Sequence, residues 1–203
     1  MRGIQFDPLW TTVFVVVAVC WAVFWVAIFA RAAQTATGSA PGERKRDPAS
    51  IAGFMLQGLS YAIVGTAWRQ PFTPVVSGGI PFEALLAIVT TALAVASLML
   101  VVSAVLTLGK QWSLTARVLS QHQLVTGGPY RFVRNPIYTG MLGMLVASVL
   151  AVSQWWVLIP ALVFFCLGTW IRVRAEERLL REAFGAQYDD YARRVPALIP
   201  FLI

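Results

Sequence analysis

The sequence predicts an all-α, polytopic membrane protein: five transmembrane helices, the last two forming a short hairpin, and a cytoplasmic helical tail. Of its 203 residues, 58% are hydrophobic and only 12% are charged, whereas a soluble domain has about 25% charged residues. The apolar residues gather in long uncharged runs, which are typical of segments that cross a bilayer. Because lipid surrounds such a chain, we expect its function to reside in the few polar residues.

The first predicted span runs from Pro8 to Ala30. The apolar region of a signal peptide has about 7–15 residues, so this run is too long for one and predicts a transmembrane helix. A cleavage site at the ARA sequence that begins at Ala30 is the alternative.

Four further apolar runs predict the remaining spans: Ile51–Trp68, Phe82–Leu108, Pro136–Val152 and Trp155–Ile171. The last two have about 17 residues each, close to the minimum for a span. Because only Ser153 and Gln154 separate them, they predict a tight helical hairpin. Small residues such as Gly53 and Gly58 let helices approach closely in lipid, so we expect them to serve in packing.

Lys and Arg gather on one side of the predicted spans. All 16 of these residues except Arg2 and Arg69 fall between the first two spans, between the third and fourth, or after the fifth. Since cytoplasmic segments carry the excess of basic residues, the amino terminus is predicted outside and the carboxyl terminus in the cytoplasm. This bias and anionic lipid headgroups account for the net charge of +7. The dispersed basic residues match no nucleic-acid-binding pattern, so no nucleic-acid partner is expected.

Several kinds of site are missing from the sequence. One histidine, His122, and two cysteines inside predicted spans, Cys20 and Cys166, do not make up an ordinary zinc site, so no metal is expected. Neither a phosphate-binding GxxxxGK[ST] loop nor a GxSxG nucleophile motif occurs. No ionisable residue lies well inside a predicted span, which argues against a transporter or a proton pathway.

The polar residues at the base of the hairpin are brought together by its topology. Its turn is so short that its two cytoplasmic ends must be neighbours. The residues expected within reach of one another are Asn135, Tyr138, Arg172 and Glu176. On a continuous helix, Arg172 and Glu176 also share a face. Such a cluster suits a flat, zwitterionic, partly apolar ligand. Taken singly, each feature has a plainer interpretation, because arginines at a span end anchor topology and Gly-Gly-Pro forms turns.

Four blocks in the second half of the chain resemble, in order and spacing, the isoprenylcysteine carboxyl methyltransferase family of integral-membrane methyltransferases. The blocks are LGKQWS, HQLVTGGPYRFVRNPIYTG, RVRAEERLL and FGAQYDDYARRVPALIP. The wider group includes phospholipid N-methyltransferases. The similarity extends from Leu108 to the carboxyl terminus, and the first three spans match only as generic helices. We therefore expect an N-terminal three-span region, residues 1–108, and a methyltransferase core, residues 109–203, made of a cytoplasmic cofactor-binding loop, the hairpin and the tail.

The resemblance implies S-adenosylmethionine as methyl donor, held at the cytoplasmic face. The cofactor-binding residues that it implies are Gln123, Leu124, Val125, Gly128, Tyr130, Asn135, Tyr138, Gly140 and Glu176. The catalytic positions that it implies are Arg172, which would anchor a substrate carboxylate, and the paired acids Glu176 and Glu177. Asn135 stands where the family has His. Its amide can hydrogen-bond a carboxylate, but it carries no charge and does not act as a base.

The predicted function is methyl transfer to a lipidic or membrane-partitioned acceptor, first of all a carboxylate. The alternatives are a phospholipid amine headgroup or a small thiol, for which Glu176 or Glu177 would have to accept a proton. A third hypothesis is a non-enzymatic membrane scaffold that the polar cluster merely anchors. The expected partners are the acceptor and the membrane lipids. Binding of the donor separates the scaffold from the enzymes, and screening of acceptors separates the two enzymes.

Overall fold

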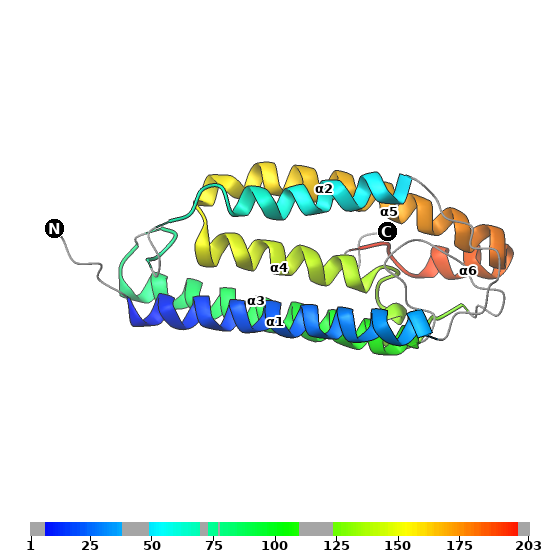
Figure 1. The fold of residues 1–203 in the computed structure, drawn as a ribbon, viewed down its shortest axis with the longest axis horizontal. Coiled ribbons are helices and arrows are strands. Elements are labelled where there is room, and N and C mark those ends of the chain that lie inside the picture. Colours follow the sequence, from blue (N-terminus) through cyan, green and yellow to red (C-terminus); the bar gives the residue numbers. More distant parts are fainter. Residues whose placement is uncertain (1–6, 38–48, 70–72, 77, 110–123, 199–203) are drawn as a thin grey trace.

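The computed structural model describes residues 7–37, 49–69, 73–76, 78–109 and 124–198, and these residues form helices joined by turns (Figure 1). The α-helices are α1 (Pro8–Thr37), α2 (Ala49–Val64), α3 (Ile80–Leu108), α4 (Pro136–Val152), α5 (Leu158–Phe184) and α6 (Ala186–Arg194). Two short 3-10 helices, η2 (Gly128–Arg131) and η3 (Trp155–Val157), precede α4 and α5. Over the described ranges, the predicted all-α class is confirmed.

Three helical segments are long and apolar enough to cross a membrane, namely Pro8–Gln34, Ile80–Leu108 and Trp155–Phe184. Helices α2 and α4 are apolar but shorter, with 16 and 17 residues. The five-span count therefore stays a prediction. Helix α5 continues without a break beyond the predicted end of its span at Ile171, so one rigid rod carries Arg172 and the two glutamates.

The helices pack as two groups on either side of α4. Helix α2 runs along α5, whereas α1 lies along α3, and α4 packs mainly against α3 (Figure 1). Glycines mark the closest approaches. A Cβ added to Gly140 would lie 2.5 Å from Cγ2 of Val101 and 2.8 Å from the carbonyl oxygen of Ser97. A Cβ added to Gly168 of α5 would lie 2.6 Å from the carbonyl oxygen of Gly53 on α2. Close backbone packing of this kind holds helices together in lipid.

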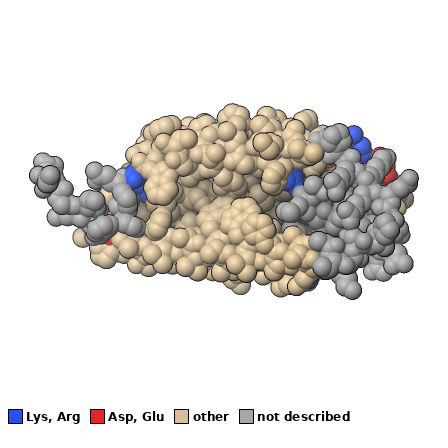
Figure 2. All heavy atoms as spheres, in the orientation of Figure 1, with Lys and Arg blue, Asp and Glu red and all other residues tan. Residues whose placement is uncertain are grey.

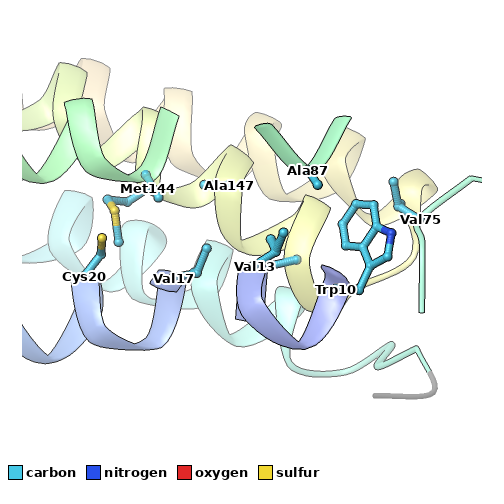
Figure 3. Packing of buried hydrophobic residues seen from close by; sticks show 10 residues of the cluster. Trp10, Val13, Val17, Cys20, Val75, Ala87, Met144 and Ala147 are labelled. Atoms are coloured by element: carbon cyan, nitrogen blue, oxygen red, sulfur yellow. The ribbon is translucent and has the colours of Figure 1, made fainter. Parts of the chain in front are cut away.

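A cluster of buried apolar residues joins α1, α3 and α4 at the end of the bundle near the start of α1. Figure 3 shows Trp10, Val13, Val17, Cys20, Val75, Ala87, Met144 and Ala147 facing one another. The small and branched residues let α1 pack against α3 and α4, and Trp10, near the start of α1, is fully buried in the cluster. This packing holds α1 against α3 and α4.

A buried arginine secures the same end of the bundle. Nη2 of Arg69 donates hydrogen bonds to the carbonyl oxygens of Leu150 and Ala151, at 2.9 and 2.8 Å, and the guanidinium carbon lies 5.6 Å from the Trp10 ring centroid. These carbonyls belong to the last turn of α4, which lacks helical donors and favours a cation. Burial lowers the pKa of Arg69 to about 10, so the side chain is still charged at neutral pH. Arg69 thus ties the segment after α2 to α4.

Candidate functional site at the base of the hairpin

A cavity of about 750 Å³ lies between α1 and α2 and follows α4 along its length. Its walls are mainly apolar and aromatic, with Trp21 and Trp25 from α1 and Phe54 and Tyr61 from α2. Figure 2 shows this face of the molecule hollowed, with a surface around the hollow that is almost entirely free of charged atoms in the described part. The polar residues gather at one end of the cavity, where α4 begins and α5 leaves the apolar zone.

Three side chains from α4 and α5 form a closed polar cluster at that end. The Tyr138 hydroxyl donates a hydrogen bond to Oε1 of Glu176 and accepts one from Nε of Arg172 at 2.8 Å. Nη2 of Arg172 lies 3.7 Å from the same carboxylate oxygen of Glu176. Tyr138 and Arg172 are buried, and their mutual hydrogen bonds replace those that burial removes. The predicted proximity of these three residues is therefore observed, whereas their roles stay predictions.

Tyr130 brings a further ring to this end from η2. Gly128 before it has a φ of 58°, a left-handed conformation that glycine adopts without strain. The Tyr130 carbonyl accepts a hydrogen bond of 2.6 Å from the Tyr191 hydroxyl of α6. Burial raises the pKa of the Tyr130 hydroxyl, and the charge of Glu176 adds to this effect. Tyr130 is thus held between the tail and the acidic end of the cavity.

The chain end that follows α6 crosses the start of α4. Backbone N–H groups of Arg134 and Asn135 donate to the carbonyl oxygens of Pro196 and Ala197, at 2.8 and 3.1 Å. Nδ2 of Asn135 also donates to the Ala197 carbonyl, at 3.0 Å. Because a carbonyl oxygen only accepts hydrogen bonds, this contact fixes the orientation of the amide. The NH₂ group of Asn135 therefore faces the tail, where one of its two N–H donors is engaged by the Ala197 carbonyl, and its Oδ1 faces away.

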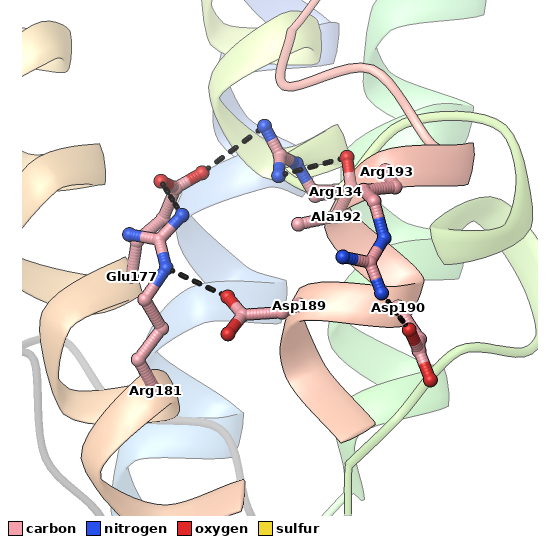
Figure 4. Close-up of polar contacts among 7 residues, drawn as sticks. All are labelled: Arg134, Glu177, Arg181, Asp189, Asp190, Ala192 and Arg193. Carbon is pink, nitrogen blue, oxygen red and sulfur yellow. Dashed lines mark hydrogen bonds and ion pairs between the residues drawn. The ribbon is translucent and has the colours of Figure 1, made fainter. Parts of the chain in front are cut away.

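Glu177, the second of the paired acids, points away from this cavity. Its carboxylate lies 3.3 Å from Nη2 of Arg134 and 3.4 Å from Nη2 of Arg181, and Nε of Arg181 donates to Asp189 at 3.1 Å (Figure 4). Glu177 lines a second cavity, of about 420 Å³. Burial raises the pKa of Tyr188 on α6, and the charge of Glu177 contributes to the rise. Glu177 thus connects α5 to α6 and to the segment before α4.

The predicted site residues divide into three groups. Those that line the large cavity are Tyr130, Asn135, Tyr138, Arg172 and Glu176. Those described elsewhere are Leu124, Val125, Gly128, Gly140 and Glu177. Gln123 lies outside the described residues. Packing explains the two glycines, because a Cβ on Gly128 would lie 2.8 Å from Oγ1 of Thr107 and Gly140 is pressed against α3.

The sequence interpretation missed the contribution of α1 and α2. Nε1 of Trp21 donates to Oγ of Ser148 at 2.9 Å, and the Tyr61 hydroxyl donates to the Met141 carbonyl at 2.7 Å. The two rings meet edge to face, with centroids 5.0 Å apart, so they join α1 and α2 above α4. The available signal was the presence of Trp and Tyr within apolar runs, because their polar atoms need partners when they are buried.

Known proteins resemble about half of the chain in sequence. The family model described as phospholipid methyltransferase matches residues 85–187. A probable protein-S-isoprenylcysteine O-methyltransferase from Oryza sativa subsp. indica is 36% identical over 106 residues, or 49% of this chain and 53% of that protein. The cobalt-zinc-cadmium resistance protein CzcN of Cupriavidus metallidurans is 36% identical over 98 residues, or 47% of this chain and 44% of that protein. The chain thus spans about half the length of the curated relatives it matches.

A solved structure resembles the fold. The eukaryotic intramembrane Ras methyltransferase ICMT (isoprenylcysteine carboxyl methyltransferase) superposes with a TM-score of 0.51 at 21% identity, over 75% of this chain and 51% of that one. The family match begins within α3 and ends within α6, so it includes the cluster of Tyr138, Arg172 and Glu176. Since this match extends over half of the 203 residues, the chain belongs to the phospholipid methyltransferase family.

Proposed function

We propose that the protein is an integral-membrane methyltransferase that uses S-adenosylmethionine to methylate the carboxylate of an amphiphilic, membrane-partitioned acceptor. The observation that carries this proposal is the form of the large cavity. An apolar groove ends at a buried arginine, Arg172, which lies beside an acidic and aromatic corner. The groove suits the apolar chain of an acceptor, and the arginine suits the carboxylate of that acceptor. The corner, formed by Glu176, Tyr130 and Tyr138, suits a cationic methyl donor. Relatives named as isoprenylcysteine O-methyltransferases support the same assignment.

The apolar part of the cavity would hold the acceptor chain. It follows α4 from Tyr138 to Val152, which is about 21 Å at a rise of 1.5 Å per residue. Each buried methylene of a ligand contributes about 0.8 kcal/mol, so a long chain gains substantial affinity there. Because α1 and α2 form the two rims, a lipid chain would enter from the bilayer without leaving an apolar environment.

Arg172 would hold the acceptor carboxylate. A guanidinium binds a carboxylate through two parallel hydrogen bonds, which an ammonium does not reproduce. Arg172 lies where the apolar walls end, and Tyr138 fixes its Nε. The side chain is therefore pre-oriented before an acceptor arrives, which lowers the cost of ordering it.

The charge and the aromatic rings at the acidic corner would suit S-adenosylmethionine. This donor carries two positive centres, and the carboxylate of Glu176 lies beside the rings of Tyr130 and Tyr138, which also attract cations. Oδ1 of Asn135, turned away from the tail, would be a further acceptor. We therefore assign donor binding to Glu176, Tyr130, Tyr138 and Asn135, and give Glu177 a role in holding α6.

When bound, S-adenosylmethionine supplies a methyl group to an incoming nucleophile and leaves as a neutral thioether. An acceptor carboxylate is already anionic, so the chain needs no general base for this reaction. The protein would position the acceptor carboxylate through Arg172 and hold the donor against Glu176. Such positioning accounts for much of the rate enhancement of an enzyme. The apolar walls would keep water from the reacting atoms.

The two predicted regions would act together. Residues 109–203 supply the polar cluster, but α1 and α2, within residues 1–108, form the groove walls. We therefore propose that the N-terminal helices select the acceptor chain, while the remainder of the chain holds the donor.

The test uses the purified full chain in lipid nanodiscs with methyl-labelled donor and a free S-prenylated cysteine. The expected product is a methyl ester, which mild base hydrolyses to labelled methanol. A base-stable labelled product from an amine or thiol acceptor would replace the carboxylate with that acceptor. Failure to bind the donor, measured by calorimetry, would contradict the enzyme and favour the scaffold.

A further inference from the structure

We propose that Gly53 of α2 is a positioning residue for Arg172, because the missing side chain leaves the space that the arginine stem occupies. The inference deepens the proposed function, since it assigns the orientation of the acceptor anchor to a helix outside residues 85–187, where the family match lies. It rests on the proposed function for its activity readout, and a stability readout tests it independently.

The geometry at Gly53 is tight on the side that faces α5. A Cβ added to Gly53 would lie 2.6 Å from Cγ of Arg172 and 3.3 Å from its backbone nitrogen. It would also lie 2.6 Å from the carbonyl oxygen of Gly168. Cγ is near the base of the arginine side chain, so it has little freedom to move aside while the helix stays in place. Any residue larger than glycine must therefore displace the stem, the helix or both.

The displaced stem would carry the guanidinium out of its present position. The Arg172 guanidinium carbon lies 5.5 Å from the ring centroid of Phe54 and 5.3 Å from that of Tyr138. Phe54 follows Gly53 on α2. The same turn of α2 therefore leaves space for the aliphatic part of Arg172 and places an aromatic ring near its guanidinium. Such contacts favour a cation and restrict its orientation.

In a Gly53→Ala protein, we expect the positioning of the acceptor to be impaired more than the binding of the donor. Arg172 would still be charged and present in a Gly53→Ala protein, but its guanidinium would no longer be held toward Tyr138. A carboxylate anchored there would be misplaced, and a shift of about 1 Å can lower a rate by about 100-fold. Donor binding should suffer less, because Tyr138 and Glu176 contact each other directly.

The activity experiment compares Gly53→Ala with Gly168→Ala in the purified full chain. A Cβ on Gly168 would meet the same helix contact, 2.6 Å from the Gly53 carbonyl oxygen and 3.0 Å from the Gln57 nitrogen, with Arg172 absent from its nearest neighbours. We expect Gly53→Ala to lower kcat/KM for the acceptor by roughly 10- to 100-fold with little change in donor affinity. Gly168→Ala should lose less. Equal losses in both proteins would attribute the effect to helix spacing and overturn the inference.

The stability experiment is independent of any acceptor. Arg172→Ala removes the Cγ atom that an alanine at position 53 would strike, whereas Arg172→Lys keeps it. We expect Gly53→Ala to lower the melting temperature by several degrees in the wild-type and Arg172→Lys backgrounds, and by clearly less in Arg172→Ala. Additive effects in all three backgrounds would overturn the inference, even if the wild-type protein methylates its acceptor.

Gly58→Ala is the matched substitution on the same helix. Apart from its chain neighbours and the nearby backbone of α2, a Cβ at Gly58 would meet no described atom within 4 Å. Its effect on melting temperature should be the same in the wild-type and Arg172→Ala backgrounds. Coupling of Gly58→Ala to Arg172 as strong as that of Gly53→Ala would show a general response of α2 and overturn the specific role. If no acceptor is methylated but the Gly53–Arg172 coupling is found, the proposed function fails and the positioning contact stands.

Discussion

The hydroxyl of Tyr138 on α4 donates a hydrogen bond to Glu176 on α5, and it thereby joins the two ends of the hairpin at the polar end of the apolar cavity. Nε of Arg172 binds the same hydroxyl at 2.8 Å. One tyrosine therefore connects the proposed acceptor anchor to the proposed donor carboxylate. This arrangement lets substitutions separate the two roles.

Arg172→Lys should lower methyl transfer by roughly 10- to 100-fold and leave donor affinity almost unchanged. Lysine keeps the positive charge and the long stem, so membrane insertion should survive, but it does not bind a carboxylate in the bidentate manner. The measurement is turnover and calorimetric donor binding on the same preparation. Full activity would make Arg172 a topology anchor, and a large loss of donor binding would move it to the donor site.

Glu176→Ala should weaken donor affinity by about 1.5–3 kcal/mol, the scale of a hydrogen bond to a charged group. The matched control is Glu182→Ala, which removes an exposed carboxylate from the same helix outside the cavity. Calorimetry in nanodiscs compares the two proteins. Unchanged affinity in both Glu176→Ala and Tyr138→Ala would count against the proposed donor site.

Gly140→Ala should destabilise the protein rather than change how the donor binds. The added Cβ would press on Val101 and on the Ser97 carbonyl of α3, and overpacking of this kind typically costs about 1–3 kcal/mol. Gly127→Ala is the control, since its Cβ would meet no described atom within 4 Å beyond its two chain neighbours. Thermal unfolding measures both variants. A normal melting temperature together with lost donor affinity in Gly140→Ala would return this glycine to the cofactor site.

Asn135→Asp should loosen the tail from α4. The carboxylate has the shape of the amide but no donor, so it would face the Ala197 carbonyl with like partial charge, at a cost of about 1–3 kcal/mol. Hydrogen exchange of the tail amides should accelerate relative to those of α3. Exchange as slow as in the wild type would show that the side-chain contact at 3.0 Å contributes little to holding the tail.

The basic residues predict the orientation in the membrane, and reporter fusions test it. A reporter after Ile203 should be cytoplasmic, and one inserted near Ser77 should lie outside, because Arg2 and Arg69 are the two basic residues on that side of the predicted spans. Reporters on the same side would exclude the five-span arrangement. Because α3 and α5 are long enough to span, reporters on opposite sides would also indicate that the shorter helix α4 crosses the bilayer.

The sequence by itself determined the features that depend on neighbours along the chain. The bounds of α4, Pro136–Val152, were predicted correctly, because Pro136 pre-sets the first helical turn and the apolar run ends at Ser153. The shared face of Arg172 and Glu176 follows from helical spacing alone. The short hairpin turn then required Tyr138 to meet them.

Only the tertiary structure decided which way side chains face between helices. Glu176 and Glu177 are adjacent in sequence, yet the first lines the large cavity and the second pairs with Arg134 and Arg181. The difference arises because successive residues on a helix point about 100° apart, and the packing of α4, α6 and the tail chooses the partner of each. The role of α2 at Gly53 was hidden for the same reason: in lipid, apolar runs fit many neighbours, and close contact between particular small residues selects one.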